Sequence, residues 1–324
     1  MRKYADGGSS YTYQVEEGSP ETVTFGKPPQ GFDAVKASAE ELEDFAFPPR
    51  PTEEPALANW EEMVSKFETT APPIACSGKV GPSLSPAEGE VEYSTLAASR
   101  NWSGYIANAP LFPNHFVMAQ SNYYQPYGNK HASCKSNALE ASWVGVGGRN
   151  TGALIQAGTS VNTSNGVGAF AVWTAGSSYH DANPSLNFEP GNYMGMYASY
   201  ERSTEHVYFY LENATTHELS PFRGEHIGTN YYDGTSAEAI VERPATTVEG
   251  ELHLYPLLNY GTMTWWNSVV QTSANIVYNI GEVNNLDMEM TRSGNTGVEL
   301  SELLALPGSL SLNKNWESFY YNCQ

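Results

Sequence analysis

Basic residues are scarce in this sequence. Its 324 residues include 16 Lys and Arg against 36 Asp and Glu, which gives a formal net charge of -20. Nucleic acids and anionic membranes attract proteins through basic patches, so we expect no nucleic-acid partner and no membrane partner. Long apolar runs are also missing, and the sequence therefore predicts no transmembrane helix.

Cysteine, metal-binding and cofactor-binding patterns are equally sparse. Cys76, Cys134 and Cys323 are widely spaced without a CxxC motif, so their pairing stays open and a zinc site is not predicted. The seven histidines do not pair at ligand spacing, and no GxSxG, HExxH or P-loop motif occurs. We expect no metal and no cofactor. The first ten residues, MRKYADGGSS, contain no apolar segment typical of a signal peptide.

The N-terminal part of the chain, residues 1–95, differs from the remainder in composition. It holds eleven of the 20 prolines and predicts an extended, Pro-rich arm with short helices. One helix is expected to begin at Ser38, because the sequence SAEE fits a capping box. Another is expected near Asn59, where apolar residues recur at helical spacing. A pro-segment, a flexible leader and a plain linker all fit this arm.

Residues 96–324 show a β pattern. Short stretches rich in Val, Tyr, Phe, Trp and Thr are separated by Gly, Asn, Ser and Pro. Many short strands with turn signals between them, and no long amphipathic helix, are typical of an antiparallel β-sandwich or barrel. The expected fold class is therefore all-β, with one β domain behind the N-terminal arm.

The stretch TSAEAIVERP places two acids on one side of a predicted strand. Side chains alternate along a strand, so Glu238 and Glu242 share a face. If this face is exposed to solvent, the two glutamates need no functional explanation. As a glycosidase pair they are too far apart, since four residues span roughly 13 Å of strand whereas such carboxyls lie less than about 10 Å apart. A catalytic partner must come from elsewhere in the chain.

A candidate partner is Gln156 in the stretch GALIQAGTS. Its amide lies in an otherwise apolar strand, where it needs a hydrogen-bond partner. A purely structural role would explain it as well. Glutamine cannot act as a base, but its amide N–H can donate to a developing oxyanion while a carboxylate activates water.

Six short motifs in a fixed order resemble the glutamic peptidases, the eqolisin family. They are NWSG from Asn101, SWVG from Ser142, LIQAG from Leu154, AVW from Ala171, the hairpin YLENATTHELS and the strand SAEAIVE from Ser236. The resemblance covers about residues 100–260 and extends more weakly to the C-terminus. The arm also resembles the leader of bacterial members.

The resemblance implies a concanavalin-like sandwich of two large antiparallel sheets with a substrate cleft, and an endopeptidase that acts in acid. It also implies a catalytic pair, in which Glu242 is the base that activates water and Gln156 holds the water and the oxyanion. The substrate-binding residues that we expect along the cleft are Trp143, Trp173, Glu238 and Tyr105.

The resemblance implies further properties, and a second interpretation of the function stays open. We expect a polypeptide substrate, a secreted monomer and an N-terminal arm that shields the cleft as in a zymogen. The family pattern is broken at Ala239 and Gly147, and at Ala171 and Ala175 two expected acids are missing. The rival is therefore a degenerate, non-catalytic module whose cleft binds a peptide or carbohydrate. Cleavage specificity and pH optimum stay open.

Overall fold

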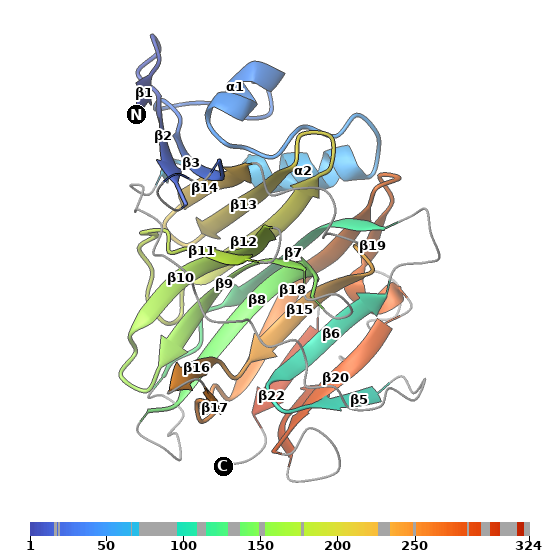
Figure 1. Ribbon diagram of the computed structural model, residues 1–324. Coiled ribbons are helices and arrows are strands. Elements are labelled where there is room, and N and C mark those ends of the chain that lie inside the picture. The colour runs from blue at the N-terminus through green and yellow to red at the C-terminus, as the bar shows by residue number, and fades with distance from the viewer. Residues whose placement is uncertain are drawn as a thin grey trace.

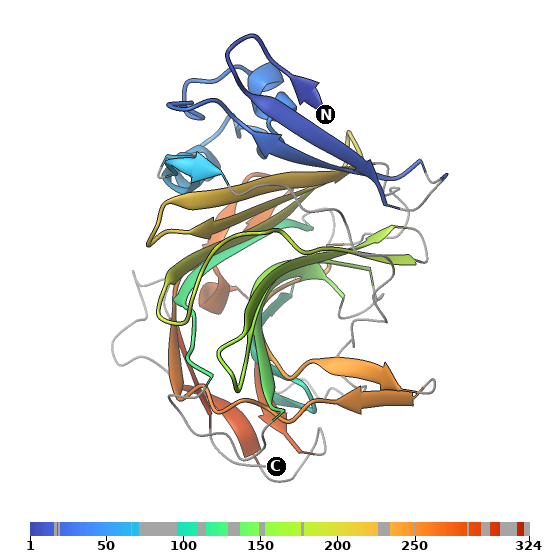
Figure 2. The ribbon, with the colours of Figure 1, turned by 90° about the vertical axis from the view of Figure 1, so that its left-hand side faces the viewer.

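The computed structural model describes most of the chain and confirms the all-β prediction. The described residues are 1–15, 18, 20–65, 67–70, 96–108, 115–128, 137–148, 153–175, 178–225, 234–248, 251–283, 285–292, 299–304 and 316–320. Their strands form two large sheets that pack face to face as a sandwich (Figures 1 and 2). Cys76, Cys134 and Cys323 lie outside these residues, so their pairing stays untested.

The first sheet, called sheet 1, contains the strands that carry five of the six motifs, whereas the hairpin YLENATTHELS belongs to the second sheet. Its strands in spatial order are β5 (Leu96–Ser99), β20 (Asn285–Thr291), β6 (Trp102–Asn108), β15 (Ser236–Glu242), β8 (Leu139–Gly147), β9 (Leu154–Asn162), β10 (Val167–Ala175) and β11 (Ser178–Ala182). All neighbouring pairs are antiparallel except β5 and β20.

The second sheet, sheet 2, runs through the middle of the chain and takes up its N-terminal end. Its strands in order are β1 (Arg2–Lys3), β2 (Ser9–Gln14), β3 (Thr22–Lys27), β14 (Glu218–Glu225), β13 (His206–Asn213), β12 (Tyr193–Glu201), β7 (Phe116–Tyr124) and β18 (Thr262–Thr272). β19 (Val277–Asn279) also pairs with β18, and η1 (Ile280–Glu282) follows it. β21 (Glu299–Leu304) and β22 (Trp316–Tyr320) link β20 to β18, which joins the two sheets at one edge. A separate hairpin is formed by β16 (Ala245–Val248) and β17 (Glu251–Leu254).

The main hydrophobic core fills the space between the sheets. Alternate residues of the strands enter it, for example Ile155 and Val241 from sheet 1 and Phe209 from sheet 2. Tyr123 of β7 crosses the core, where its hydroxyl donates to the backbone oxygen of Ser142 over 2.8 Å. The opposite side chains of each sheet-1 strand therefore form a second face, which points away from this core.

The N-terminal segment, residues 1–70, is a folded part of the molecule and not an extended arm. β2 and β3 form a hairpin, and β3 adds to the edge of β14 (Figure 1). The capping box at Ser38 is confirmed at the start of α1 (Ala39–Asp44). The second helix, α2 (Ala56–Val64), is also confirmed, but it begins three residues before the predicted Asn59. β4 (Thr69–Thr70) pairs in parallel with β14.

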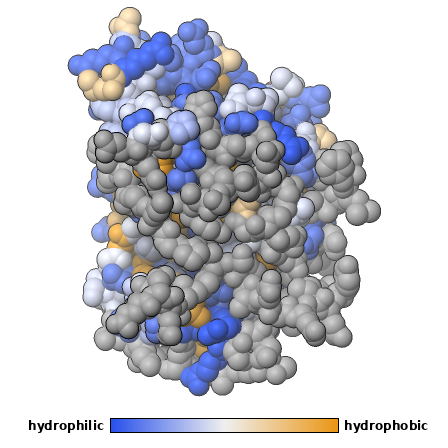
Figure 3. Space-filling model, in the orientation of Figure 1, coloured by the Kyte–Doolittle hydropathy of each residue, from blue (hydrophilic) through white to orange (hydrophobic). Residues whose placement is uncertain are grey.

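This segment covers the outer face of sheet 2. Trp60 and Met63 of α2 pack with Tyr197, Tyr210 and other side chains that point away from the main core. Asn59 donates to Gln120 over 2.9 Å, and Tyr210 donates to the backbone oxygen of Met63 over 3.0 Å. The end of the molecule that carries this segment is largely hydrophilic at its surface (Figure 3). Neither α1 nor α2 is long and apolar enough to cross a membrane, and no other described helix is.

Candidate active site

The two glutamates of β15 lie on the free face of sheet 1. Ala237, Ala239 and Val241 enter the core between the sheets, so Glu238 and Glu242 point the other way. Gln156 of β9 also lies on this face, because its neighbours Ile155 and Ala157 belong to the core. The structure therefore places all three polar side chains on one face, as the sequence predicted.

The strand register shows which of these residues are opposite one another. Gln156 pairs with Gly145 of β8, and Gly145 pairs with Glu238 of β15. Glu242 pairs with Ala141, four residues further along β8. Gln156 and Glu238 thus occupy the same row across the sheet, whereas Glu242 lies two rows away on that face.

Gly145 leaves room between Gln156 and Glu238. A Cβ atom at this position would lie 2.8 Å from the backbone oxygen of Ile155, 3.1 Å from a ring carbon of Trp143 and 3.2 Å from the Cβ of Gln156. Such contacts are tighter than most real ones, so a larger residue would push against the glutamine or the indole ring. The glycine keeps the space over the centre of the row free.

Glu242 is held by an indole ring. The Nε1–H of Trp143 donates to Oε2 of Glu242 over 2.7 Å, a short hydrogen bond of the kind that an ionised acceptor favours. Trp143 packs edge to face against Trp102, with 5.0 Å between the ring centroids. Both indole side chains are fully buried, while Glu242 is 8% exposed. Trp143 was predicted to line the cleft; the structure places its indole beside the candidate base, and its role in substrate binding stays a prediction.

Burial dominates the acidity of Glu242. Loss of water around the carboxylate raises its pKa to about 7, while hydrogen bonding from Trp143, Trp102 and Asn101 lowers it. The side-chain N–H groups of Trp102 and Asn101 make no hydrogen bond of standard geometry in the structure, so Trp143 is the principal donor to Glu242. Half of the Glu242 side chains would then be protonated near neutral pH.

Gln156 has hydrogen-bonding capacity to spare. It is 4% exposed, and its Oε1 has no hydrogen-bond partner among the described residues. A buried amide oxygen without a partner costs free energy, typically about 1–3 kcal/mol, unless a water or a ligand satisfies it. The amide is therefore available to a molecule that enters this face.

Two of the predicted cleft residues lie on the other side of sheet 1. Trp173 is fully buried in the core between the sheets, where its ring lies 5.7 Å from that of Phe209. Tyr105 also packs against this core, and burial with the nearby Asp287 raises its pKa to about 12. The prediction that these two side chains line the cleft is wrong, because the register turns each of them inward.

Ala171, where an acid was expected, is also a core residue. An acid at this position would point between the sheets, so its absence removes nothing from the candidate face. In contrast, Trp102 belongs to the site although it was not predicted there. The NWSG motif contained the signal, but only the pairing of Trp102 with Glu242 shows its position.

The described part of the N-terminal segment does not cover this face. Its helices pack on the far side of sheet 2, while its strands β2 and β3 extend sheet 2 at one edge and contribute Val23 and Phe25 to the main core. A shielding role stays a prediction for residues 71–95 alone, which lie outside the described residues. Within the described part of the chain, no group of three or more His, Cys, Asp and Glu is arranged to hold a metal.

Comparison with solved structures agrees with the fold. Two solved structures resemble the chain: scytalido-glutamic peptidase with a peptide-based transition-state analogue, and SCP-B, a member of the eqolisin family, with the tripeptide Ala-Ile-His. Both are 17% identical to the chain and cover 68% of it and 98% of their own length, with TM-scores of 0.55 and 0.54. At this identity they show the fold. No curated protein matches the sequence.

A family model gives the assignment. The model of the Peptidase A4 family matches residues 100–303, which is more than half of the chain and includes every motif of the candidate face. The resemblance to the eqolisins is thereby confirmed. The chain belongs to the Peptidase A4 family, the glutamic peptidases.

Proposed function

We propose that this glutamic endopeptidase hydrolyses peptide bonds with Glu242 and Gln156 as its catalytic pair. The observation that carries the proposal is their common face, on which Trp143 donates to the carboxylate and the amide oxygen of Gln156 has no hydrogen-bond partner among the described residues. Both side chains are more than nine-tenths buried, and in such a site hydrogen bonds to a developing charge are stronger than in water.

The proposed reaction has two steps. The Glu242 carboxylate takes a proton from a water molecule as the water oxygen attacks the carbonyl carbon of the scissile bond, and the Gln156 amide N–H donates to the resulting oxyanion. Glu242 then returns the proton to the leaving nitrogen as the C–N bond breaks. The products are a new carboxyl terminus and a new amine, and Glu242 is again a carboxylate.

The pKa of Glu242 sets the expected pH range of this mechanism. A base must be ionised, so kcat/KM should fall about tenfold for each pH unit below the pKa, which is about 7 in the free site. We therefore expect activity in mildly acidic to neutral solution, a less acidic range than the family resemblance implies. Secretion, a monomeric state and zymogen activation stay proposals from the resemblance.

Incubation with casein in the presence of pepstatin tests the proposal. We expect cleavage by the wild type, and its loss in Glu242→Gln and in Gln156→Ala. Proteolysis that survives either substitution would overturn the assignment of the pair. If the wild type is inert at every pH between about 3 and 8 but still binds peptides, the non-catalytic module of the sequence analysis becomes the better account.

A further inference from the structure

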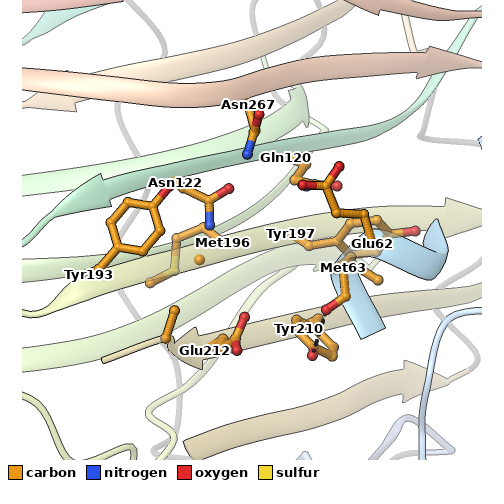
Figure 4. Close-up of a pocket in the computed structure, with 12 residues that line it drawn as sticks. Glu62, Met63, Gln120, Asn122, Tyr193, Met196, Tyr197, Tyr210, Glu212 and Asn267 are labelled. Carbon is orange, nitrogen blue, oxygen red and sulfur yellow. Dashed lines mark hydrogen bonds between the residues drawn. The ribbon is translucent and has the colours of Figure 1, made fainter. Parts of the chain in front are cut away.

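A polar cavity lies on the outer face of sheet 2, on the opposite side of the sandwich from Gln156 and Glu242. It forms where α2 meets β7, β12 and β13 (Figure 4). Its volume is about 60 Å³, which is room for a few water molecules or for the tip of one side chain. Its polar lining includes Glu62, Gln120, Asn122, Tyr193, Glu212 and Asn267.

The floor of the cavity is a glycine between an amide and a carboxylate. Gly195 of β12 pairs with Asn122 on one side and with Glu212 on the other. A Cβ atom on Gly195 would lie 2.9 Å from the Asn122 amide nitrogen and 3.5 Å from Oε2 of Glu212. The missing side chain therefore leaves a small volume beside both polar groups.

A break in the regular strand brings a further amide to the cavity. The pairing of β18 with β7 shifts register between Trp266 and Val269, as in a β-bulge. Asn267 lies within this bulge with φ of 52°, a left-handed conformation that asparagine adopts more readily than most residues. Bulges often redirect a side chain, and in Figure 4 Asn267 reaches toward Asn122.

The cavity carries negative charge. Glu62 of α2 and Glu212 of β13 enter it from different elements (Figure 4), and no Lys, Arg or His is among the described residues that line it. The pKa of Tyr193 is raised to about 12, mainly by burial. The neighbouring Tyr124, Glu62 and Glu212 raise this pKa as well. A cation that enters the cavity would meet a favourable potential on a protein of net charge -20.

We propose that this cavity binds the guanidinium group of an arginine side chain presented by another polypeptide. A guanidinium has five N–H donors in one plane and no acceptor, and the lining includes the carboxylates of Glu62 and Glu212 and the side-chain amides of three further residues. The ring of Tyr193 adds an aromatic face of the kind on which guanidinium groups stack. The size of the cavity fits a side-chain tip and not a whole small-molecule ligand. The site is independent of the proposed peptidase chemistry.

The test compares two probes that differ only in charge. N-acetyl-arginine methylamide and its neutral isostere N-acetyl-citrulline methylamide are titrated into the full chain to about 10 mM, with binding followed by calorimetry or NMR. We expect the arginine probe to bind at least about tenfold more tightly, because only its hydrogen bonds to carboxylate are charge-assisted. Equal binding of both probes, or no binding of the arginine probe, would overturn the proposal.

Substitutions then locate the site. Gly195→Ala fills the floor, and its one tight contact is with the movable end of the Asn122 side chain, so it should abolish binding of the arginine probe while the protein stays folded. Gly168→Ala is the matched control, because its Cβ would make only an ordinary contact of 3.6 Å with Ser160. Glu62→Gln changes an exposed residue and should weaken binding about three- to tenfold. Unchanged affinity in both Gly195→Ala and Glu62→Gln would place the arginine elsewhere, whereas casein cleavage should be normal in all three variants.

Discussion

Replacement of Trp143 by Phe removes the principal hydrogen-bond donor to the candidate base. The indole N–H lies 2.7 Å from Oε2 of Glu242, and both side chains are buried. Without this donor the carboxylate loses a stabilising contact while the protonated form loses much less. The pKa of Glu242, already raised to about 7 by burial, should therefore rise further.

The size of this effect follows from the strength of the bond. A hydrogen bond to a charged group contributes about 1.5–3 kcal/mol, and each pKa unit corresponds to about 1.36 kcal/mol. The pKa of Glu242 in Trp143→Phe should thus rise by about one to two units. At pH 6 the ionised fraction would fall from about a tenth to about a hundredth or less, and kcat/KM would fall in proportion.

The assay is kcat/KM for a fluorogenic peptide, measured at half-unit steps of pH from about 5 to 9. The acid limb of the profile should move to higher pH in Trp143→Phe and stay in place in Trp265→Phe. Trp265 is an equally buried tryptophan of the main core that packs on Tyr123, so this control reproduces the loss of packing. If the acid limb of the profile lies at the same pH in the wild type and in Trp143→Phe, this hydrogen bond does not lower the pKa of the catalytic base, and the reasoning is refuted.

Three further predictions concern stability. Burial raises the pKa of Glu140 from 4.5 to about 8, so the free energy of unfolding should fall as the pH rises from about 4.5 through 8. In Glu140→Gln, calorimetry should show that this fall is smaller by a few kcal/mol. An unchanged pH dependence would contradict the buried position of Glu140. Deletion of residues 1–70 exposes the edge of β14 and the aromatic outer face of sheet 2, so the truncated chain should aggregate or unfold. Size-exclusion chromatography and urea unfolding test this. A soluble product that unfolds cooperatively would show that the sandwich does not need this segment to fold. Gly104→Ala places a Cβ 2.1 Å from the backbone oxygen of Ala239 at φ of 153°, so it should destabilise the protein by several kcal/mol in urea unfolding, whereas Gly168→Ala should be nearly neutral.

Local signals in the sequence were sufficient for much of the fold. The alternating strands and the capping box at Ser38 depend on neighbours in the chain, and both were predicted correctly. The hairpin of β2 and β3 was not predicted, because prolines and acids dominated the composition of the first 95 residues. Its edge pairing joins Phe25 to Phe222, almost two hundred residues away, and no local pattern reports such a contact.

The face on which a side chain lies was predictable only where a motif fixed it. Gln156, Glu238 and Glu242 share a face as expected, but Trp173 and Tyr105 lie on the opposite one. A shift of one residue along a strand moves a side chain from one face of the sheet to the other. An error of one residue in matching a strand to a motif therefore puts the side chain on the wrong face. The raised pKa of Glu242 was also beyond the sequence, since it comes from burial among residues of several strands.

The most direct test of the account compares Glu242→Gln with Glu238→Gln, two isosteric changes on one strand. The register places Glu238 in the row of Gln156, but Trp143 donates to Glu242. If Glu242 is the base, kcat/KM for a peptide substrate should fall by at least about 10³-fold in Glu242→Gln and by much less in Glu238→Gln. A larger loss in Glu238→Gln, with substantial activity left in Glu242→Gln, would contradict the account and make Glu238 the base.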